Sequence, residues 1–202
     1  MPSFLEHFGV CVGAITGVLA ARGKRVDLFG VLVLAVVTAF GGGTLRDVLV
    51  GDLPVTWLRG PSLLCNVVIT AVATFFIARF FELPHRALLI ADAFVLAVFA
   101  MIGTRKGITL HFSAPVCVLL GVITGVAGGI LRDVLTGEVP MVFRREIHLY
   151  ATAALLGAIV CVASNLVGAG ENIATFAGAF VVLALRLAAM RWKISLPLFE
   201  SK

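Results

Sequence analysis

The strongest constraint on this chain is a glycine-rich stretch inside a long apolar run, followed at once by an arginine and an aspartate. The sequence GGGTLRDVL occupies residues 41–49, and GGILRDVL recurs at residues 128–135, so that Gly42 and Gly128 stand 86 positions apart. Each glycine inside a helix costs about 1 kcal/mol relative to alanine, and a charge inside an apolar helix costs more. A locally unfavourable stretch that occurs twice in the same sequence indicates a functional site.

The composition places this stretch in a membrane protein. Hydrophobic residues make up 60% of the 202 residues and charged residues 13%, whereas a soluble domain is about half apolar and a quarter charged. The basic residues behind the net charge of +5 are dispersed near the ends of the apolar runs. This pattern favours contact with lipid headgroups over nucleic acid. Residues 1–8 lack the basic region of a secretory leader, so we expect the first span to be retained.

Seven apolar segments are each near the length of about 20 residues that crosses a bilayer. The sequence therefore predicts an all-α integral membrane protein with seven transmembrane helices. The expected spans are 5–21, 28–50, 61–81, 87–103, 114–136, 147–166 and 173–189. Proline and glycine close the second and fifth of these segments.

The repeat extends well beyond the glycine-rich stretch. At the same offset of 86 the following residues match: Glu6 with Asp92, Gly17 with Gly103, Thr38 with Thr124, Asp52 with Glu138, and Pro54 with Pro140. Residues 5–81 and 87–166 thus form two three-helix repeats of a single membrane domain, with 173–189 as an extra helix. Because three is odd, the two copies are expected to enter the membrane from opposite sides, as an inverted repeat.

The distribution of basic residues predicts the orientation, since cytoplasmic loops are enriched in lysine and arginine. One expected face holds Arg22, Lys24, Arg25, Arg79, Arg86, Arg132, Arg144, Arg145, Arg186, Arg191, Lys193 and Lys202. The other holds Arg46, Arg59, Arg105 and Lys106. We therefore expect the N-terminus outside the cell and the C-terminus in the cytoplasm.

The glycines are expected to bend or unwind their helices at 41–43 and 128–129. Broken helices are tolerated in a membrane where they line a cavity, and freed carbonyls there could coordinate a cation. The alternative is close helix packing through small residues. If the stretch is helical, alanine at Gly42 and Gly43 should stabilise it by about 1 kcal/mol per site.

The polar residues around the glycines could line a path or support it. Neighbours in a helix point about 100° apart, so we expect ion pairs across the repeats, Arg46 with Asp133 and Arg132 with Asp47. The alternative is that these charges snorkel to the interfaces. Hydroxyls come from Thr38, Thr44 and Thr124, which could line the path or bond their own backbone.

Other polar residues have simpler interpretations. Glu6 and Asp92 are expected to be helix-end carboxylates favoured by the helix dipole and water, and Asn66 is expected to bond another helix. The four cysteines lie in apolar runs, and neither they nor the four histidines show metal-ligand spacing. With no nucleophile–base arrangement, phosphate loop or metal cluster in the sequence, we expect neither an enzyme nor a bound cofactor.

The doubled G-G-G-x-L-R-D motif, the inverted three-span repeat and the seventh span resemble the trimeric intracellular cation channel family. The closer likeness is to its prokaryotic branch, long labelled a glycine-transporter family. The resemblance implies a homotrimer with a pore in each subunit, lined by second and fifth helices that kink at the glycines, and permeant K+ and Na+ as the only metal ions. Carried over, the kinks are Gly41, Gly42, Gly43, Gly128 and Gly129, with Thr38, Thr44, Arg46, Asp47, Thr124, Arg132 and Asp133 as lining or support. Ala127 stands where the first copy has Gly41, which predicts a milder second kink.

Two function classes fit this sequence. The first is a monovalent cation channel in the inner membrane of the cell, in contact with lipids. The second is a secondary transporter of a small solute such as glycine, because inverted repeats with broken helices serve both classes. A structural membrane protein would leave the glycines and the charges in the spans unexplained.

Overall fold

The computed structural model describes residues 3–81, 84, 86–144, 149–192 and 194, and all regular structure in those ranges is helical. The α-helices are α1 (Ser3–Ala20), α2 (Leu28–Val50), α3 (Pro61–Phe80), α4 (Ala87–Thr109), α5 (Ala114–Leu135), α6 (Tyr150–Leu166) and α7 (Glu171–Trp192). Two short 3₁₀ helices, η1 (Thr56–Leu58) and η2 (Met141–Phe143), follow α2 and α5. The fold is therefore all-α, as the sequence predicts.

Local residue chemistry sets the helix ends. The side chain of Asp27 accepts a hydrogen bond of 2.8 Å from the Gly30 N–H and caps the start of α2. Gly51 ends α2 in the left-handed conformation with φ of 69°, where glycine carries no steric penalty. Pro61 opens α3 at the first helical turn, where its missing N–H is not needed. These residues produce the alternation of long helices and tight connections.

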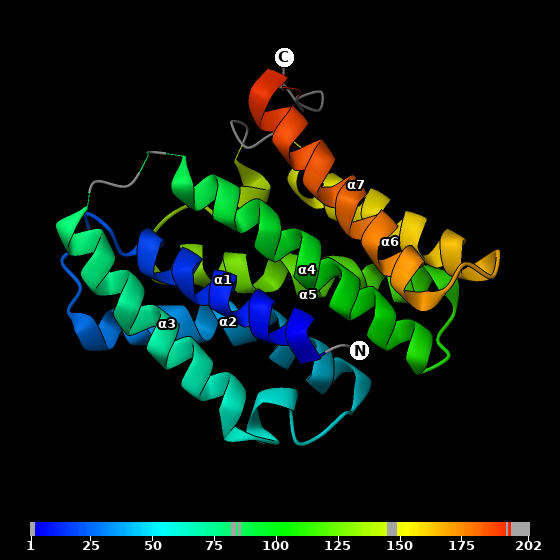
Figure 1. Cartoon of the computed structure of the whole chain (residues 1–202), viewed down its shortest axis with the longest axis horizontal. Coiled ribbons are helices and arrows are strands. Elements are labelled where there is room, and N and C mark those ends of the chain that lie inside the picture. Colours follow the sequence, from blue (N-terminus) through cyan, green and yellow to red (C-terminus); the bar gives the residue numbers. More distant parts are fainter. Residues whose placement is uncertain (1–2, 82–83, 85, 145–148, 193, 195–202) are drawn as a thin grey trace, which may run out of the picture.

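The helices pack as two groups with a common centre (Figure 1). In the first group α1 packs against α2 and α3, and in the second α4 packs against α5 and α6. The groups meet where α1 contacts α4 and α2 contacts α5, and α7 packs on α4 and α6. One apolar core fills the first group and receives Val95, Phe99 and Ile102 from α4, while a second core fills the rest.

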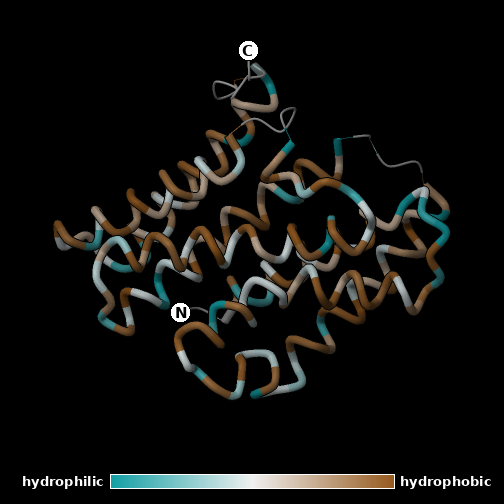
Figure 2. Tube along the Cα trace, turned by 180° about the vertical axis from the view of Figure 1, so that it is seen from behind, coloured by the Kyte–Doolittle hydropathy of each residue, from teal (hydrophilic) through white to brown (hydrophobic). Residues whose placement is uncertain are grey.

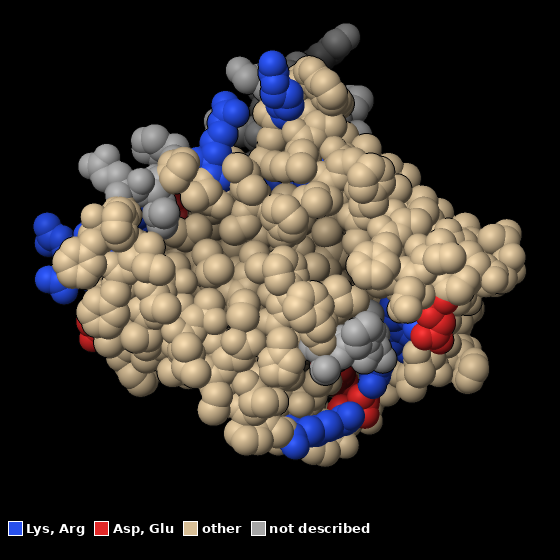
Figure 3. Space-filling model, viewed as in Figure 1, with Lys and Arg blue, Asp and Glu red and all other residues tan. Residues whose placement is uncertain are grey.

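The surface matches a membrane environment. Five helices, α2, α3, α4, α5 and α7, are long and apolar enough to cross a bilayer, and α1 and α6 are shorter apolar helices. Figure 2 shows apolar residues along the helices and hydrophilic residues toward their ends and connections. In the face seen in Figure 3, the described acidic and basic side chains gather near the periphery and leave the middle without them. The chain is therefore a multi-pass membrane protein.

The expected spans agree with the helices to within a few residues, with one larger difference. α4 continues to Thr109, so Arg105 and Lys106 lie inside its last turns instead of beyond its end. Asn66 of α3 bonds another helix, as predicted, because it donates to the His7 carbonyl of α1 at 3.2 Å. The four cysteines are free.

Candidate functional site

The centre of the molecule is a crossing of α2 and α5 at which backbone meets backbone. A Cβ added to Gly42 would overlap the carbonyl oxygen of Thr124, and a Cβ added to Gly128 would overlap that of Thr38. The two contacts are related by the 86-residue offset of the sequence repeat. Glycine at these two positions is therefore required by close helix packing, the alternative that the sequence left open.

The expectation of unwound turns at the glycines is wrong. α2 runs as one unbroken α-helix through Gly41, Gly42 and Gly43, and α5 does so through Gly128 and Gly129. The helical backbone pattern therefore continues through both glycine stretches. The bend itself stays a prediction.

The glycines next to the crossing have different surroundings. A Cβ on Gly43 would meet only the Nη2 atom of Arg46, at 3.9 Å, so alanine fits there. A Cβ on Gly41 would meet the tip of Leu131, which can move. The predicted stabilisation by alanine is consequently wrong for Gly42, where a fixed carbonyl blocks the new methyl group.

The threonines of the crossing bond their own helices. The Thr38 hydroxyl donates to the Leu34 carbonyl at 2.6 Å, and the Thr124 hydroxyl donates to the Leu120 carbonyl at 2.5 Å. Together with Gly42 and Gly128 they also line an enclosed pocket that is too small for a water molecule. Thr44, by contrast, accepts a hydrogen bond of 3.1 Å from the indole of Trp57.

The charged residues that follow the glycines pair within each helix, not across the repeats. Arg46 donates from Nε and Nη2 to Oδ1 of Asp47 at 2.8 and 2.7 Å, and Arg132 donates from Nε to Oδ1 of Asp133 at 2.9 Å. The expected pairs Arg46–Asp133 and Arg132–Asp47 are therefore wrong. The arginine side chain is long enough to fold back onto the next residue, which compensates for the 100° between neighbours. Snorkelling is wrong as well, because all four residues are at most 4% exposed.

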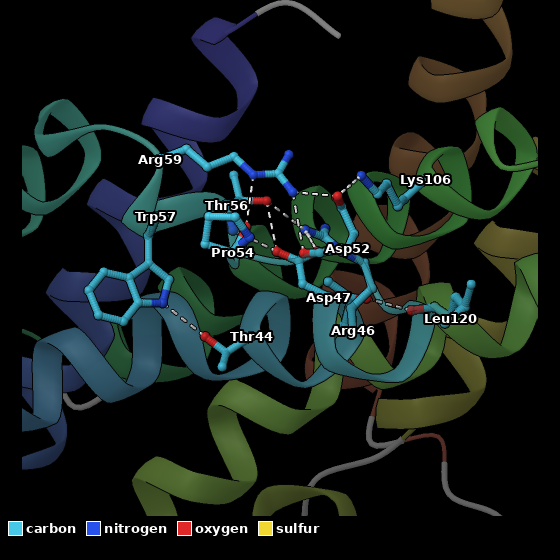
Figure 4. A network of polar contacts seen from close by, with 11 residues as sticks. Thr44, Arg46, Asp47, Asp52, Pro54, Thr56, Trp57, Arg59, Lys106 and Leu120 are labelled. Atoms are coloured by element: carbon cyan, nitrogen blue, oxygen red, sulfur yellow. Dashed lines mark hydrogen bonds and ion pairs between the residues drawn. The ribbon is translucent and has the colours of Figure 1, made fainter.

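The second oxygen of each aspartate fastens the loop that follows. Oδ2 of Asp47 accepts hydrogen bonds of 2.8 Å from the backbone N–H and the hydroxyl of Thr56, the first residue of η1 (Figure 4). Oδ2 of Asp133 accepts one of 2.7 Å from the N–H of Met141, the first residue of η2. Each Arg–Asp pair thus joins a helix end to the next connection through charge-assisted hydrogen bonds.

Cross-repeat ion pairs do exist, one step further along the chain. Asp52, in the connection after α2, binds both Arg59 of its own loop and Lys106 of α4 (Figure 4). The hydrogen bond from Lys106, followed by that from Arg59, lowers the pKa of Asp52 to about 2 from its usual 3.8. This carboxylate ties the first repeat to the second.

Glu138 occupies the equivalent position after α5. It pairs with Lys24, from the connection between α1 and α2, and with Arg144 of its own loop at 3.3 Å. The hydrogen bond from Lys24 lowers the pKa of Glu138 below its usual value. Both ends of the bundle are therefore closed by one carboxylate, one lysine of the other repeat and one arginine of the same loop.

The two repeats differ in what lies behind their arginines. In the first repeat, Arg46, Asp47 and Thr44 line a cavity of about 40 Å³ together with Glu6 and Trp57, which we name the first-repeat cavity. Glu6 is partly buried, and among the described residues it has no hydrogen-bond or ion-pair partner.

In the second repeat the corresponding space is filled. Asp92, at the position equivalent to Glu6, is buried and accepts a bond of 2.9 Å from Nη1 of Arg132, so its interpretation as a solvated helix-end carboxylate is wrong. The guanidinium of Arg186 lies 4.8 Å from the ring centre of Tyr150. We name Asp92, Arg132, Asp133, Tyr150 and Arg186 the second-repeat cluster.

The sequence analysis missed Tyr150 and used Arg186 only for orientation. Arg186 carried a usable signal, because it stands inside the seventh apolar run, where a charge needs a partner. Tyr150 carried none.

Comparison with known proteins places the chain among bacterial membrane proteins. The family model described as glycine transporter matches twice, at residues 3–79 and 89–165. The UPF0126 inner membrane protein YadS of Escherichia coli K12 is 44% identical over 97% of this chain and 95% of its own length. A UPF0126 membrane protein of Vibrio cholerae serotype O1 is 43% identical over 96% of this chain and 81% of its own length.

Solved structures give the same result in three dimensions. The trimeric intracellular cation channel orthologue from Rhodobacter sphaeroides is 39% identical, covers 95% of this chain and 97% of its own, and superposes with a TM-score of 0.89. A second channel, described in a study of conductance through TRIC cation channels, is 34% identical, covers 100% and 98% of the two chains, and has a TM-score of 0.89.

The crossing predicts opposite effects for adjacent glycines. Gly42→Ala forces a methyl group onto the Thr124 carbonyl and should destabilise the protein by about 1–3 kcal/mol. Gly43→Ala meets open space and should keep or raise stability, by up to about 1 kcal/mol. Thermal unfolding of both purified variants in detergent, with Gly128→Ala as the repeat equivalent of Gly42→Ala, measures the difference. Equal stability of Gly42→Ala and Gly43→Ala would contradict the backbone contact.

The loop carboxylates predict a dependence on pH. Because the pKa of Asp52 is lowered, its ion pairs stabilise the fold above pH 3.8, and this stabilisation is lost as the pH falls toward 2. Asp52→Asn should therefore lower the melting temperature at pH 6, and its difference from wild type should become much smaller as the pH falls to 2. Glu138→Gln provides a parallel test at the other end. A difference that persists unchanged at pH 2 would mean that packing, not charge, is responsible.

Proposed function

The chain belongs to the family described as glycine transporter, which is the prokaryotic branch of the trimeric intracellular cation channel family. We propose that it conducts monovalent cations between α2 and α5 of each subunit. The observation that carries this proposal is the arrangement of polar groups around the crossing. On α2, Thr38, Gly42 and Arg46 are spaced four residues apart and so share one helix face. On α5, Thr124, Gly128 and Arg132 do the same. A line of hydroxyl, backbone and charged groups thus runs through an apolar bundle along two facing helices.

The described conformation is closed under this proposal. The pocket at the crossing admits no water, and a cation needs water or several oxygen ligands to pass. Conduction therefore requires α2 and α5 to separate or bend at Gly42 and Gly128. Glycine suits this motion because no side chain from either helix interlocks with the other at these positions.

The names of the similar structures support a cation as the permeant species and a trimer as the assembly. The similar structures are named as cation channels, and one is named as trimeric. We extend these properties to this chain as a homotrimer with a pore in each subunit, K+ and Na+ as permeant ions, and lipid against the exposed apolar helix faces. Asp47, Asp92 and Asp133 are paired with arginines, so the cation preference that we propose rests on the carboxylate of Glu6 in the first-repeat cavity.

The topology completes the proposal. All seven helices span the membrane, α1 and α6 with fewer apolar residues than the others, and the two repeats have inverted orientation. The N-terminus lies outside and the C-terminus in the cytoplasm, as the distribution of basic residues predicts. The relative from Escherichia coli is named as an inner membrane protein, which supports the same location here.

The description of the family model favours a second candidate, a secondary transporter of glycine or a similar small solute. A transporter with inverted repeats also has its site where the repeats meet. The two candidates differ in turnover, because a channel passes many ions per opening whereas a transporter moves its substrate once per conformational cycle.

Recording from purified protein in a planar bilayer distinguishes these functions. Under a K+ gradient we expect discrete unitary currents whose reversal potential lies close to that of K+ and far from that of Cl−. The matched assay is counterflow of labelled glycine into proteoliposomes from the same preparation. Glycine counterflow without unitary currents would replace the channel by the transporter.

The topology is tested by reporters active only in the cytoplasm. A fusion after Lys202 should be active, and an insertion in the turn before α7, at Gly170, should be silent, because α7 separates the two positions by one membrane crossing. An active reporter at Gly170 together with a silent one at Lys202 would reverse the orientation. Equal activity at both positions would show that α7 does not span.

A further inference from the structure

The two halves of the proposed path are not equal, although the sequence repeat would make them so. Gly43 and Gly129 are equivalent positions, one residue beyond the crossing on each side. Gly43 lines the first-repeat cavity. A Cβ added to Gly43 would have one neighbour within 4 Å, the Nη2 atom of Arg46 at 3.9 Å. The added Cβ of Gly129 lies 3.0 Å from the Tyr150 hydroxyl and within 3.7 Å of Arg132 and Asp92. The path is therefore open beside one glycine and filled beside the other.

The two halves also differ in charge. The first-repeat cavity has one arginine, Arg46, against two carboxylates, Asp47 and Glu6. The second-repeat cluster has two arginines, Arg132 and Arg186, against two aspartates. The loop carboxylates Asp52 and Glu138 do not alter this comparison of charge. Each of them pairs with one lysine and one arginine, so the two loops carry the same net charge. Counted over the residues that the structure describes in these two sites, the first-repeat side has a surplus of one negative charge.

The difference in charge comes from α7, which has no counterpart in the first repeat. α7 packs on α4 and α6 and brings Arg186, whose side chain is fully buried, against the ring of Tyr150. A buried arginine over an aromatic ring is held in place by cation–π attraction. It therefore acts as a fixed positive charge beside one half of the path and not beside the other.

We infer that Arg186 and Glu6 make the path electrically polar, so that current carried by cations entering from the first-repeat side exceeds current in the opposite direction. This inference rests on the proposed function and deepens it. Glu6 raises the local concentration of cations at one end. Arg186 cancels the same effect at the other end and, with Tyr150, narrows the passage there. Tyr150 thus acts as a positioning residue for the charge.

The test is the ratio of unitary currents at equal positive and negative voltages in symmetric K+. Each channel keeps its own orientation in the bilayer, so the ratio of larger to smaller current is read channel by channel. A unit charge about 10 Å away changes the local cation concentration roughly twofold in water, so we expect a wild-type ratio of about two at 10 mM K+. The ratio should fall toward one at 1 M, where the Debye length is about 3 Å.

Two variants separate the contributions of the two ends. Arg186→Gln should raise the smaller current roughly twofold and bring the ratio toward one. Glu6→Gln should lower the larger current by a similar factor. Glu6 is partly exposed, so we expect this variant to leave the packing of the core intact. Arg191→Gln is the matched control, because it removes the same charge from an exposed position of the same helix, and it should leave the ratio unchanged.

The outcomes distinguish this inference from the proposed function. Wild-type protein without any cation current would reject the proposed function itself. Wild-type current with a ratio of one at 10 mM K+, or a ratio unchanged in both Arg186→Gln and Glu6→Gln, would overturn the polarity and leave the channel intact. If Arg186→Gln fails to assemble, Glu6→Gln decides alone: an unchanged ratio overturns the inference, and a reduced one supports it.

Discussion

The rest of the structure depends on the close approach of two helix backbones at Gly42 and Gly128. Small residues drive helix association in a membrane because lipid offers no hydrophobic gain and only closer packing adds attraction. The same crossing fixes where the polar groups lie. Arg46 and Arg132 follow their glycines by four residues and so stand on the same helix face, one turn further along. The contact between the two glycines, one from each repeat, thereby places a buried charge toward each end of the bundle.

Burial of those charges is possible because each arginine pairs with the aspartate that follows it. Removing one member of a buried ion pair costs about 3–5 kcal/mol, because it leaves the other charge without compensation. Here the aspartate after each arginine neutralises it with one oxygen and uses the other to bind the backbone of the following 3₁₀ helix. The motif therefore holds a connection in place as well as a charge. Its local character explains why the Arg–Asp order is repeated without change in both copies.

Much of this fold follows from the sequence, because apolar length and the offset of 86 are visible in the residue order. The seven helices lie close to the expected spans, and Thr38, Thr124 and the glycines meet at one crossing. The pairing of Arg46 with Asp47 was not predictable from helical angles, since it depends on how a flexible side chain folds back. The role of Tyr150 was hidden too, because one aromatic residue at a helix start carries no periodic signal. Sequence periodicity describes helix faces, whereas side-chain partners depend on three-dimensional packing.

The same motif ends in two different environments, because Tyr150 of α6 and Arg186 of α7 lie beside the second copy only. In the first repeat the residues around Gly43 leave a cavity of about 40 Å³, large enough for a water molecule. In the second repeat Tyr150 and Arg186 occupy the equivalent space, and α7 holds them there by packing on α4 and α6. α7 is also fastened at its other end, where Glu171 pairs with the buried Arg105 of α4. Tyr150 of α6 and Arg186 of α7 thus give two nearly identical stretches different surroundings, a cavity in the first repeat and packed side chains in the second. Sequence symmetry therefore fixes the crossing of α2 and α5, while the surroundings of its two ends are set by what packs against each repeat.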